Sequence, residues 1–263
     1  IDETSSRVDK SKRSVADSDG CLSNDYAYSG TTPSRVITKR GYSDAAWTTL
    51  KITYTYYDNV NNRLESKTLA VADPSGNTYY HYINENYSSQ GFGRVDKQVA
   101  AVADSDGAKS YVYTYFGATN TVQFKYCYSD TAFTTLVVTY QYNSSGQLIG
   151  KTLADGTIYT YYVPSGLMES RTTTAADLSG NIYYHYKNEN WNSTGFGRMD
   201  KSKRSAADTD GCKSYDYAYQ ADANGRLMTK RGSSENAWTT LVVTYTFYNV
   251  ANNYMTDKTL VTA

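Results

Sequence analysis

The stretch GQLIGKTLADGTIYTYYVPSG at 146–166 contains, without insertions, the unit from which the rest of the chain is built. An apolar residue, Leu148, is followed three positions later by the basic Lys151, then by an Asp-Gly turn and alternating tyrosines. Alternation with a period of two places these tyrosines on one face of a strand, whereas a helix would scatter them. The unit therefore predicts two strands joined by a turn, which is a β-hairpin.

The unit recurs along the whole chain of 263 residues, beginning at residues 7, 35, 63, 94, 121, 147, 167, 198, 226 and 254. The basic residue keeps its place in seven of these ten units: Lys39, Lys67, Lys125, Lys151, Arg171, Lys230 and Lys258. Longer cassettes are superimposed on the units, because RVDKSKRSVADSDG (7–20) returns at 94–107 and 198–211. We predict one repeat domain, 1–263, in three cassettes (7–93, 94–197 and a truncated 198–263).

Five of the turns share a sequence with Asp first and Gly fourth, namely those within ADSDG (16–20), ADPSG (72–76), ADSDG (103–107), ADLSG (176–180) and ADTDG (207–211). This pattern is typical of a type I turn, in which Asp accepts hydrogen bonds from the backbone and Gly tolerates a positive φ. Windows with helical periodicity and caps are absent. The sequence predicts an all-β fold of about twenty strands, in a long antiparallel sheet that curls into a shell, tube or solenoid-like form.

Together with YTYYDNVNNRLESKT (54–68) and YQYNSSGQLIGKT (140–152), the opening stretch resembles the RHS or YD-repeat family, whose unit reads Tyr-x-Tyr-Asp-x-x-Gly-Arg-Leu. The Asp after the tyrosine pair survives as Asp58, while Asn143 and Asn249 replace it elsewhere. The resemblance implies a spiralling antiparallel sheet and an extracellular or cell-surface location, as in toxin shells and surface receptors. The family's core segment with self-cleaving aspartates has no counterpart here, so no toxin-maturation chemistry is expected.

Composition excludes several classes of partner. Lys plus Arg and Asp plus Glu both number 26, so the basic field that nucleic-acid or anionic-membrane binding requires is missing. No apolar run reaches the length of a membrane span, so membrane insertion is not expected. Cys21, Cys127 and Cys212 show neither CxxC spacing nor Cys/His clustering, so we expect buried, unpaired thiols and no cofactor.

Three DxDG sequences are the candidate calcium sites, because hard cations bind clustered carboxylate oxygens. Their residues are Asp17, Asp19, Asp104, Asp106, Asp208 and Asp210. The alternative is a plain hairpin turn, and it is favoured because the later Glu of a calcium loop is missing and Ser75 and Ser179 replace the second Asp in sister turns.

The only histidines, His81 and His185, occupy one repeat position, which indicates repetition of structure rather than two active sites. Glu85 and Glu189 in the neighbouring NEN segments are the only candidates for a general acid or base, and no partner carboxylate shares their repeat position. We therefore expect no enzymatic activity.

Tyrosine-rich strands offer two interpretations. Either the rings of adjacent hairpins stack into ladders that stabilise the sheet, or exposed rings form platforms for sugar rings with asparagines at the rim. The residues of such a platform are Tyr79, Tyr80, Tyr82, Tyr183, Tyr184, Tyr186, Asn84 and Asn188.

The expected function is structural: an exported, self-assembling β-sheet subunit of an extracellular fibre, tube or shell. In cassette register KTLVTA (258–263) corresponds to KTLAVA (67–72), about one strand short of a whole number of cassettes, so head-to-tail pairing with other copies of the chain is expected. The alternatives are a glycan-binding adhesin module of a cell-surface protein and a fragment of a toxin-encapsulating shell.

Overall fold

The computed structural model of the protein describes residues 7–30, 33–87, 92–191, 193–220, 225–247 and 254–261. These residues form nineteen β-strands and contain no helix, so none of them forms a helix long and apolar enough to cross a membrane. The all-β prediction is confirmed. The chain divides into two compact units, Ile1–Thr139 and Tyr140–Ala263, and the prediction of one domain stays a prediction.

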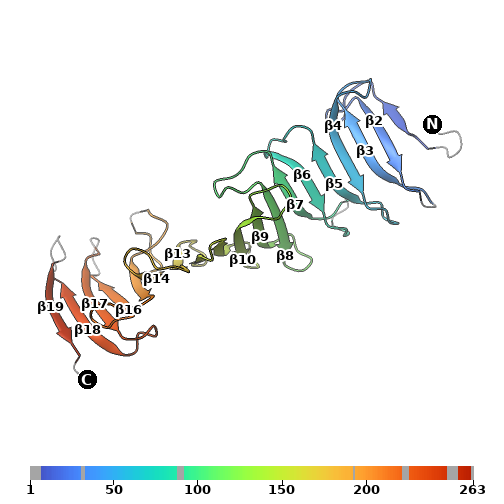
Figure 1. Ribbon diagram of the computed structural model, residues 1–263. Coiled ribbons are helices and arrows are strands. Elements are labelled where there is room, and N and C mark those ends of the chain that lie inside the picture. Colours follow the sequence, from blue (N-terminus) through green and yellow to red (C-terminus); the bar gives the residue numbers. More distant parts are fainter. Residues whose placement is uncertain are drawn as a thin grey trace. The chain divides into compact units, whose positions relative to one another are not determined.

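In the first unit each strand pairs antiparallel with the next one in the chain, and Figure 1 shows β2 to β9 in blue to green. The strands are β1 (Lys10–Lys12), β2 (Ser23–Tyr28), β3 (Val36–Tyr42), β4 (Leu50–Tyr56), β5 (Leu64–Leu69), β6 (Asn77–Tyr82), β7 (Val95–Ala100), β8 (Ser110–Tyr115) and β9 (Val122–Tyr128). Strand β10 (Leu136–Tyr142) spans the boundary between the units.

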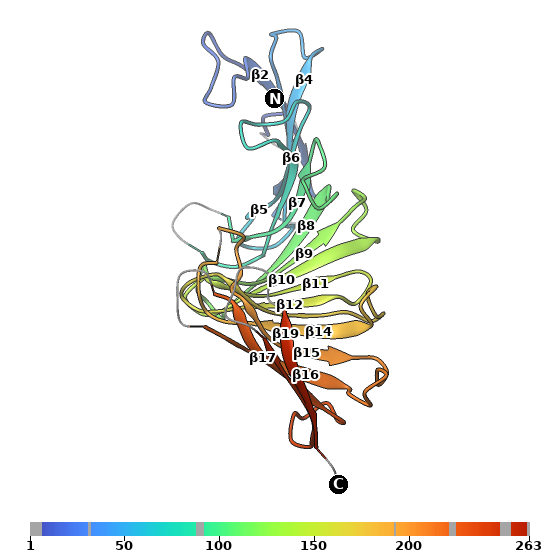
Figure 2. The same cartoon turned by 90° about the vertical axis from the view of Figure 1, so that its left-hand side faces the viewer.

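The second unit repeats this arrangement, and Figure 2 shows its strands β14 to β16 running side by side. The strands are β11 (Leu148–Leu153), β12 (Ile158–Tyr161), β13 (Met168–Thr172), β14 (Asn181–Tyr186), β15 (Met199–Arg204), β16 (Ser214–Tyr219), β17 (Leu227–Ser233), β18 (Leu241–Phe247) and β19 (Met255–Leu260).

The Asp-Gly turns have the predicted geometry. Gly20 N–H donates to the Asp17 carbonyl at 2.8 Å, and Asp17 Oδ1 accepts from the N–H groups of Asp19 and Cys21 at 3.1 and 2.9 Å. Gly20 has φ of 74°, a left-handed conformation that favours glycine. The four sister turns make the same Gly N–H to Asp carbonyl bond, so the type I turn prediction is confirmed.

A β-bulge recurs at one repeat position. His81 opposes Lys97 and Tyr82 opposes Val95, so Asp96 is the extra residue between them. The bulged residues at this position are Ile37, Glu65, Asp96, Gln123, Glu169, Asp200, Met228 and Thr256. A bulge sets two side chains of one strand against one of its partner and increases the local twist.

The buried core contains three cysteines whose place changes from one strand to the next between repeats. Cys21 packs against Gly41, where an added Cβ would lie 2.6 Å from the Cys21 Sγ, and Cys212 packs in the same way against Gly232, at 2.4 Å. The middle repeat instead has Ala108 at the cysteine position and Cys127 at the glycine position, both 0 % exposed. One sulfur therefore fills each core site, supplied by either strand, and no disulfide forms.

Candidate functional site

Tyrosines and basic residues alternate across neighbouring strands. In the first unit the Cα partners run Tyr26, Lys39, Tyr54, Lys67 and Tyr80 from β2 to β6. The prediction that equivalent tyrosines of adjacent hairpins stack directly is therefore wrong for this row, because a basic residue separates them. The stabilising contact is cation–π instead, with Lys39 Nζ 5.1 Å from the Tyr54 ring centroid and Lys230 Nζ 3.6 Å from that of Tyr215.

The first aspartate of most DxxG turns also anchors a tyrosine seven residues later. Tyr111 O–H donates to Asp104 Oδ2 at 3.0 Å, and the same bond is made by the pairs Tyr80 and Asp73, Tyr184 and Asp177, and Tyr215 and Asp208. Burial, together with the hydrogen bond to Asp104, raises the pKa of Tyr111 above its ordinary value. The tyrosine is therefore held as a neutral donor that ties the turn to its own hairpin.

The second aspartate of two turns reaches across to later strands. Asp19 accepts the hydroxyl of Tyr54 and lies 3.6 Å from Lys67 Nζ, while Asp210 accepts from Tyr245 and lies 2.5 Å from the Nζ of Lys258. Asp106 also has an interaction partner. The second aspartate of each of these two turns therefore binds a tyrosine and a lysine on two later strands.

The six candidate calcium aspartates are thus engaged with protein groups. The described part of the chain holds no group of three or more His, Cys, Asp or Glu side chains placed for a metal ion. We predict that EDTA leaves the melting temperature measured by circular dichroism unchanged, because the turn oxygens already accept hydrogen bonds. A fall of several degrees that calcium reverses would contradict this prediction.

The bulge supplies each histidine with a carboxylate that the sequence did not reveal. His81 Nδ1 lies 2.6 Å from Asp96 Oδ1, and His185 Nδ1 lies 2.5 Å from Asp200 Oδ1. Because a carboxylate only accepts, the Nδ1–H of each ring is the donor. The hydroxyl of Tyr162, 3.4 Å from His185 Nε2, donates to the Tyr186 carbonyl at 2.6 Å.

Glu85 and Glu189, the candidate general acids or bases, are each bound to an arginine. Glu189 Oε1 lies 2.6 Å from the Arg198 Nε and Oε2 lies 2.8 Å from its Nη2, and Glu85 meets Arg94 in the same way. Hydrogen bonds from Arg198 lower the pKa of Glu189 to about 2. A carboxyl with so low a pKa is a poor general acid near neutral pH.

This arrangement predicts an acid-dependent loss of stability. Because its pKa is lower in the folded chain than the ordinary 4.5, Glu189 contributes stability above pH 4.5 that is lost as pH falls towards 2. We expect the urea midpoint of the wild type to fall over this range and Glu189→Gln to show a shallower fall. Glu169→Gln is the control, because Glu169 accepts a hydrogen bond only from the Thr160 hydroxyl among the residues that the structure describes. Identical slopes for both variants and the wild type would contradict the prediction.

The predicted tyrosine platforms are divided between two faces of the sheet. Successive side chains alternate, so Tyr184 and Tyr186 share one face and Tyr183 lies on the other. The rings agree with this, since Tyr184 stacks on Tyr186 at 6.5 Å and Tyr183 lies 6.3 Å from Trp238. Tyr79, Tyr80 and Tyr82 alternate in the same way, Asn84 is exposed, and Asn188 accepts from the Ser165 hydroxyl at 2.9 Å.

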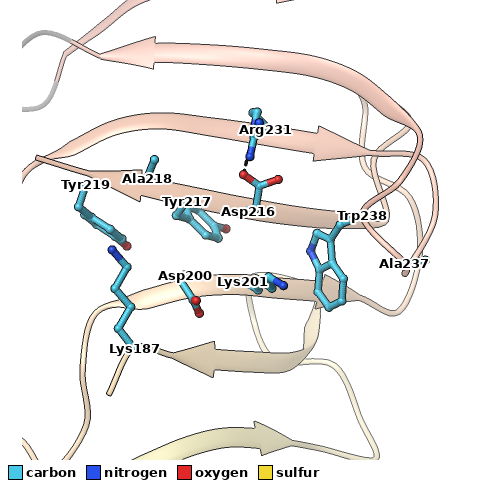
Figure 3. Close-up of a pocket in the computed structure, with 10 residues that line it drawn as sticks. All are labelled: Lys187, Asp200, Lys201, Asp216, Tyr217, Ala218, Tyr219, Arg231, Ala237 and Trp238. Carbon is cyan, nitrogen blue, oxygen red and sulfur yellow. Dashed lines mark hydrogen bonds and ion pairs between the residues drawn. The ribbon is translucent and has the colours of Figure 1, made fainter. Parts of the chain in front are cut away.

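A groove on the second unit gathers charged and aromatic residues that sequence reasoning did not connect. Its volume is about 530 Å³, and its lining residues are Lys187, Asp200, Lys201, Asp216, Tyr217, Ala218, Tyr219, Arg231, Ala237 and Trp238. Figure 3 shows Lys187 beside Tyr219 at one end and Lys201 near Trp238 at the other, with Asp216 and Arg231 between them. Lys201, Asp216 and Arg231 are Cα partners on β15, β16 and β17.

Contacts fix the groove's side chains in place. Arg231 Nε donates to Asp216 Oδ1 at 2.8 Å, and the Trp238 indole N–H donates to the Tyr215 carbonyl at 3.0 Å. The Nζ of Lys201 lies 5.0 Å from the Trp238 ring centroid, and that of Lys187 lies 5.3 Å from the Tyr219 ring centroid. The wall formed by Trp238 is thus positioned by both a hydrogen bond and a cation–π contact.

The first unit contains a sister set of these residues. Lys10, Asp25, Arg40 and Trp47 occupy the positions of Lys201, Asp216, Arg231 and Trp238. Arg40 Nε donates to Asp25 Oδ1 at 2.9 Å, and the Trp47 indole donates to the Asn24 carbonyl at 3.1 Å. The sequence AWTTL, which contains Trp47 in one cassette and Trp238 in the other, was a visible signal for the tryptophan. The lysine, aspartate and arginine lie too far from it in the sequence to form one motif with it.

Fold and contacts define a tandem β-hairpin repeat protein. No family model matches the chain, and no curated protein matches it. Among solved structures it is similar to the TcdB2–TccC3 complex (13 % identity, 91 % of this chain and 11 % of that chain, TM-score 0.24). It is also similar to the Photorhabdus luminescens Tc holotoxin pore (11 % identity, 90 % of this chain and 14 % of that chain, TM-score 0.24). A third similar structure is a porin-like protein from Bacteroides uniformis (11 % identity, 94 % of this chain and 94 % of that chain, TM-score 0.16). The chain thus spans about an eighth of the length of the Tc toxin chains.

Proposed function

We propose that this chain is a structural protein without catalytic activity, whose tandem hairpins form the wall of an extracellular fibre, tube or shell. The observation that carries the proposal is that the lysines, tyrosines and glutamates able to act in catalysis contact other side chains of the sheet, repeat after repeat. Lysines contact tyrosines, tyrosines contact turn aspartates and each Glu of the NEN segments contacts an arginine. Such contacts hold neighbouring strands in register, and a wall built from one continuous sheet requires a fixed register.

We infer that the repeats are of the YD type, and this supports export to the cell surface or beyond. The support is the recurring unit, in which the tyrosines and the basic residue keep their register while the Asp after the tyrosine pair varies. The assembly partner in this proposal is a second copy of the chain, joined head to tail, because a strand edge offers unpaired N–H and C=O groups to an equivalent strand.

Negative-stain microscopy and light scattering of the purified chain test the proposal. We expect ordered assemblies whose size increases with protein concentration. Deleting 253–263, which removes β19, should abolish them while the circular dichroism of the remaining strands is retained. A wild-type chain that stays monomeric at high concentration, with no ordered assemblies, would refute self-assembly.

A second candidate function is a glycan-binding module of a surface protein. The observation that favours it is the groove around Trp238, whose volume lies within the range of small-molecule sites. An array of acidic and neutral glycans tests this candidate, and binding to none of them would exclude it.

A further inference from the structure

The groove around Trp238 contains charged atoms that the described residues leave unpaired. The ammonium groups of Lys187 and Lys201 contact aromatic rings, and Lys187 also attracts the Glu189 carboxylate. Among the described residues, however, no carboxylate forms a direct ion pair with either ammonium group. Asp216 uses only Oδ1 to bind Arg231, and its Oδ2 accepts no hydrogen bond from the described residues. The side chain of Arg231 is 55 % exposed. The groove therefore presents cationic donors and one carboxylate acceptor to a ligand.

In the first unit, the second carboxylate oxygen of the equivalent aspartate, Asp25, already has a hydrogen-bond donor within the chain. There the hydroxyl of Tyr42 donates to Asp25 Oδ2 at 2.9 Å. Ser233 stands at the position of Tyr42 in the second unit, and its hydroxyl makes no bond to Asp216. The two sites thus share an arginine–aspartate pair, but only the second leaves the carboxylate open.

The middle repeat lacks this chemistry. Ile83, Val112, Tyr126 and Phe133 occupy the positions of Lys187, Asp216, Arg231 and Trp238. Both members of the ion pair are replaced together, yet β8 and β9 pair in the same register there, so the sheet does not need these charges. The charged set around Trp238 is therefore available for a role other than cohesion.

The loop that holds Trp238 is strained. Trp238 has φ of 60°, and Trp47 and Phe133 at the sister positions have 58° and 61°. A bulky residue in the left-handed region is unfavourable and persists only where its surroundings impose it. The surroundings thus hold the Trp238 ring at one end of the groove, so this side of the groove is formed before a ligand binds.

We propose that this groove binds an acidic oligosaccharide of the uronic-acid class. Its carboxylates bind the Lys187 and Lys201 ammonium groups, a hydroxyl donates to Asp216 Oδ2, and another accepts from the Arg231 guanidinium. The proposal rests on the glycan-binding candidate function and names its site and ligand class. Three positive and two negative charges line the groove, so it fits a ligand that combines anionic groups with hydroxyl donors.

Titration calorimetry of the whole chain with trigalacturonic acid, in low salt and at physiological ionic strength, tests the proposal. We expect one site per chain, weaker binding in the higher salt, and at least a tenfold weaker affinity for the uncharged galactotriose. The variants are Lys187→Ile and Asp216→Val/Arg231→Tyr, which copy the middle repeat, and Ser233→Tyr, which supplies Asp216 Oδ2 with the donor that Asp25 has. Each should weaken binding at least tenfold while the thermal melt shows a folded chain.

The matched control is Asp25→Val/Arg40→Tyr in the first unit, which should leave the affinity unchanged. Equal affinity of the groove variants and the wild type, or tighter binding of a sulfated trisaccharide than of trigalacturonic acid, would overturn the assignment. Saccharide binding that the groove variants do not alter would leave the glycan-binding function standing and reject this site. Binding of no saccharide at all would reject both.

Discussion

Replacing Gly41 with alanine is expected to lower the free energy of unfolding by about 1–3 kcal/mol, the usual effect of overpacking a core. The added Cβ would lie 2.6 Å from Cys21 Sγ and 2.9 Å from Ile52 Cγ2, so both neighbours would have to move. Cys21→Ala alone should also destabilise, because it leaves a cavity the size of the sulfur. Urea denaturation followed by circular dichroism measures both effects.

The double variant Cys21→Ala/Gly41→Cys should recover most of the loss, because it copies Ala108 and Cys127 of the middle repeat. We expect a coupling free energy of about 1–3 kcal/mol between the two positions, as for residues in direct contact. The reciprocal pair Ala108→Cys/Cys127→Gly is the control in the other direction. Single effects that simply add in the double variant would show that the two sites do not share one cavity.

Replacing Asn24 with tyrosine is expected to stabilise the first hairpin. Asn24 is 0 % exposed, and its side-chain Nδ2 and Oδ1 have no hydrogen-bond partner among the described residues. Tyr111 and Tyr215 stand at this position in the other cassettes and donate to the first aspartate of their turns. The tyrosine would remove the buried unpaired amide and donate to Asp17, with an expected gain of about 1–3 kcal/mol.

The neighbouring core residue decides whether the larger ring fits. Ile52 faces Asn24 across Gly41 in the first cassette, since a Cβ at Gly41 would lie 2.9 Å from Ile52 Cγ2 and 3.3 Å from Asn24 Oδ1. Val138 and Val243 hold the position of Ile52 in the other cassettes. We therefore expect the double variant Asn24→Tyr/Ile52→Val to be more stable than Asn24→Tyr alone, and Ile52→Val alone to be less stable than the wild type. A double variant with a urea midpoint below the wild type would contradict this account of the hairpin.

Hairpins and turns could be predicted because their signals are local. Alternating tyrosines and the Asp-x-x-Gly spacing lie within a few residues, and both determine backbone conformation directly. The bulge at Asp96 and Asp200 was missed because a single extra residue does not disturb a tyrosine-rich pattern. That one omission explains why the histidine–aspartate pairs were not foreseen.

The groove could not be found from a motif, because its charged and aromatic residues come from three strands and two loops: Lys201, Asp216 and Arg231 from strands, and Lys187 and Trp238 from loops. A signal nevertheless existed in the comparison of cassettes. Asp25 with Arg40, and Asp216 with Arg231, are retained together, while the middle cassette replaces both. Paired replacement of residues fifteen apart indicates contact between adjacent strands, and the register confirms it.

Hydrogen–deuterium exchange of the intact chain, read by mass spectrometry, tests most directly whether repeated contacts hold each hairpin to the next. The account predicts protected amides in every strand of both units, with rapid exchange at the Asp-Gly turn tips. Tyr215→Phe, which removes the donor to Asp208, should increase exchange in β15, β16 and β17 and leave the strands of the first unit unchanged. Strands that exchange as fast as an unfolded chain, or a Tyr215→Phe variant with wild-type protection around β16, would contradict it.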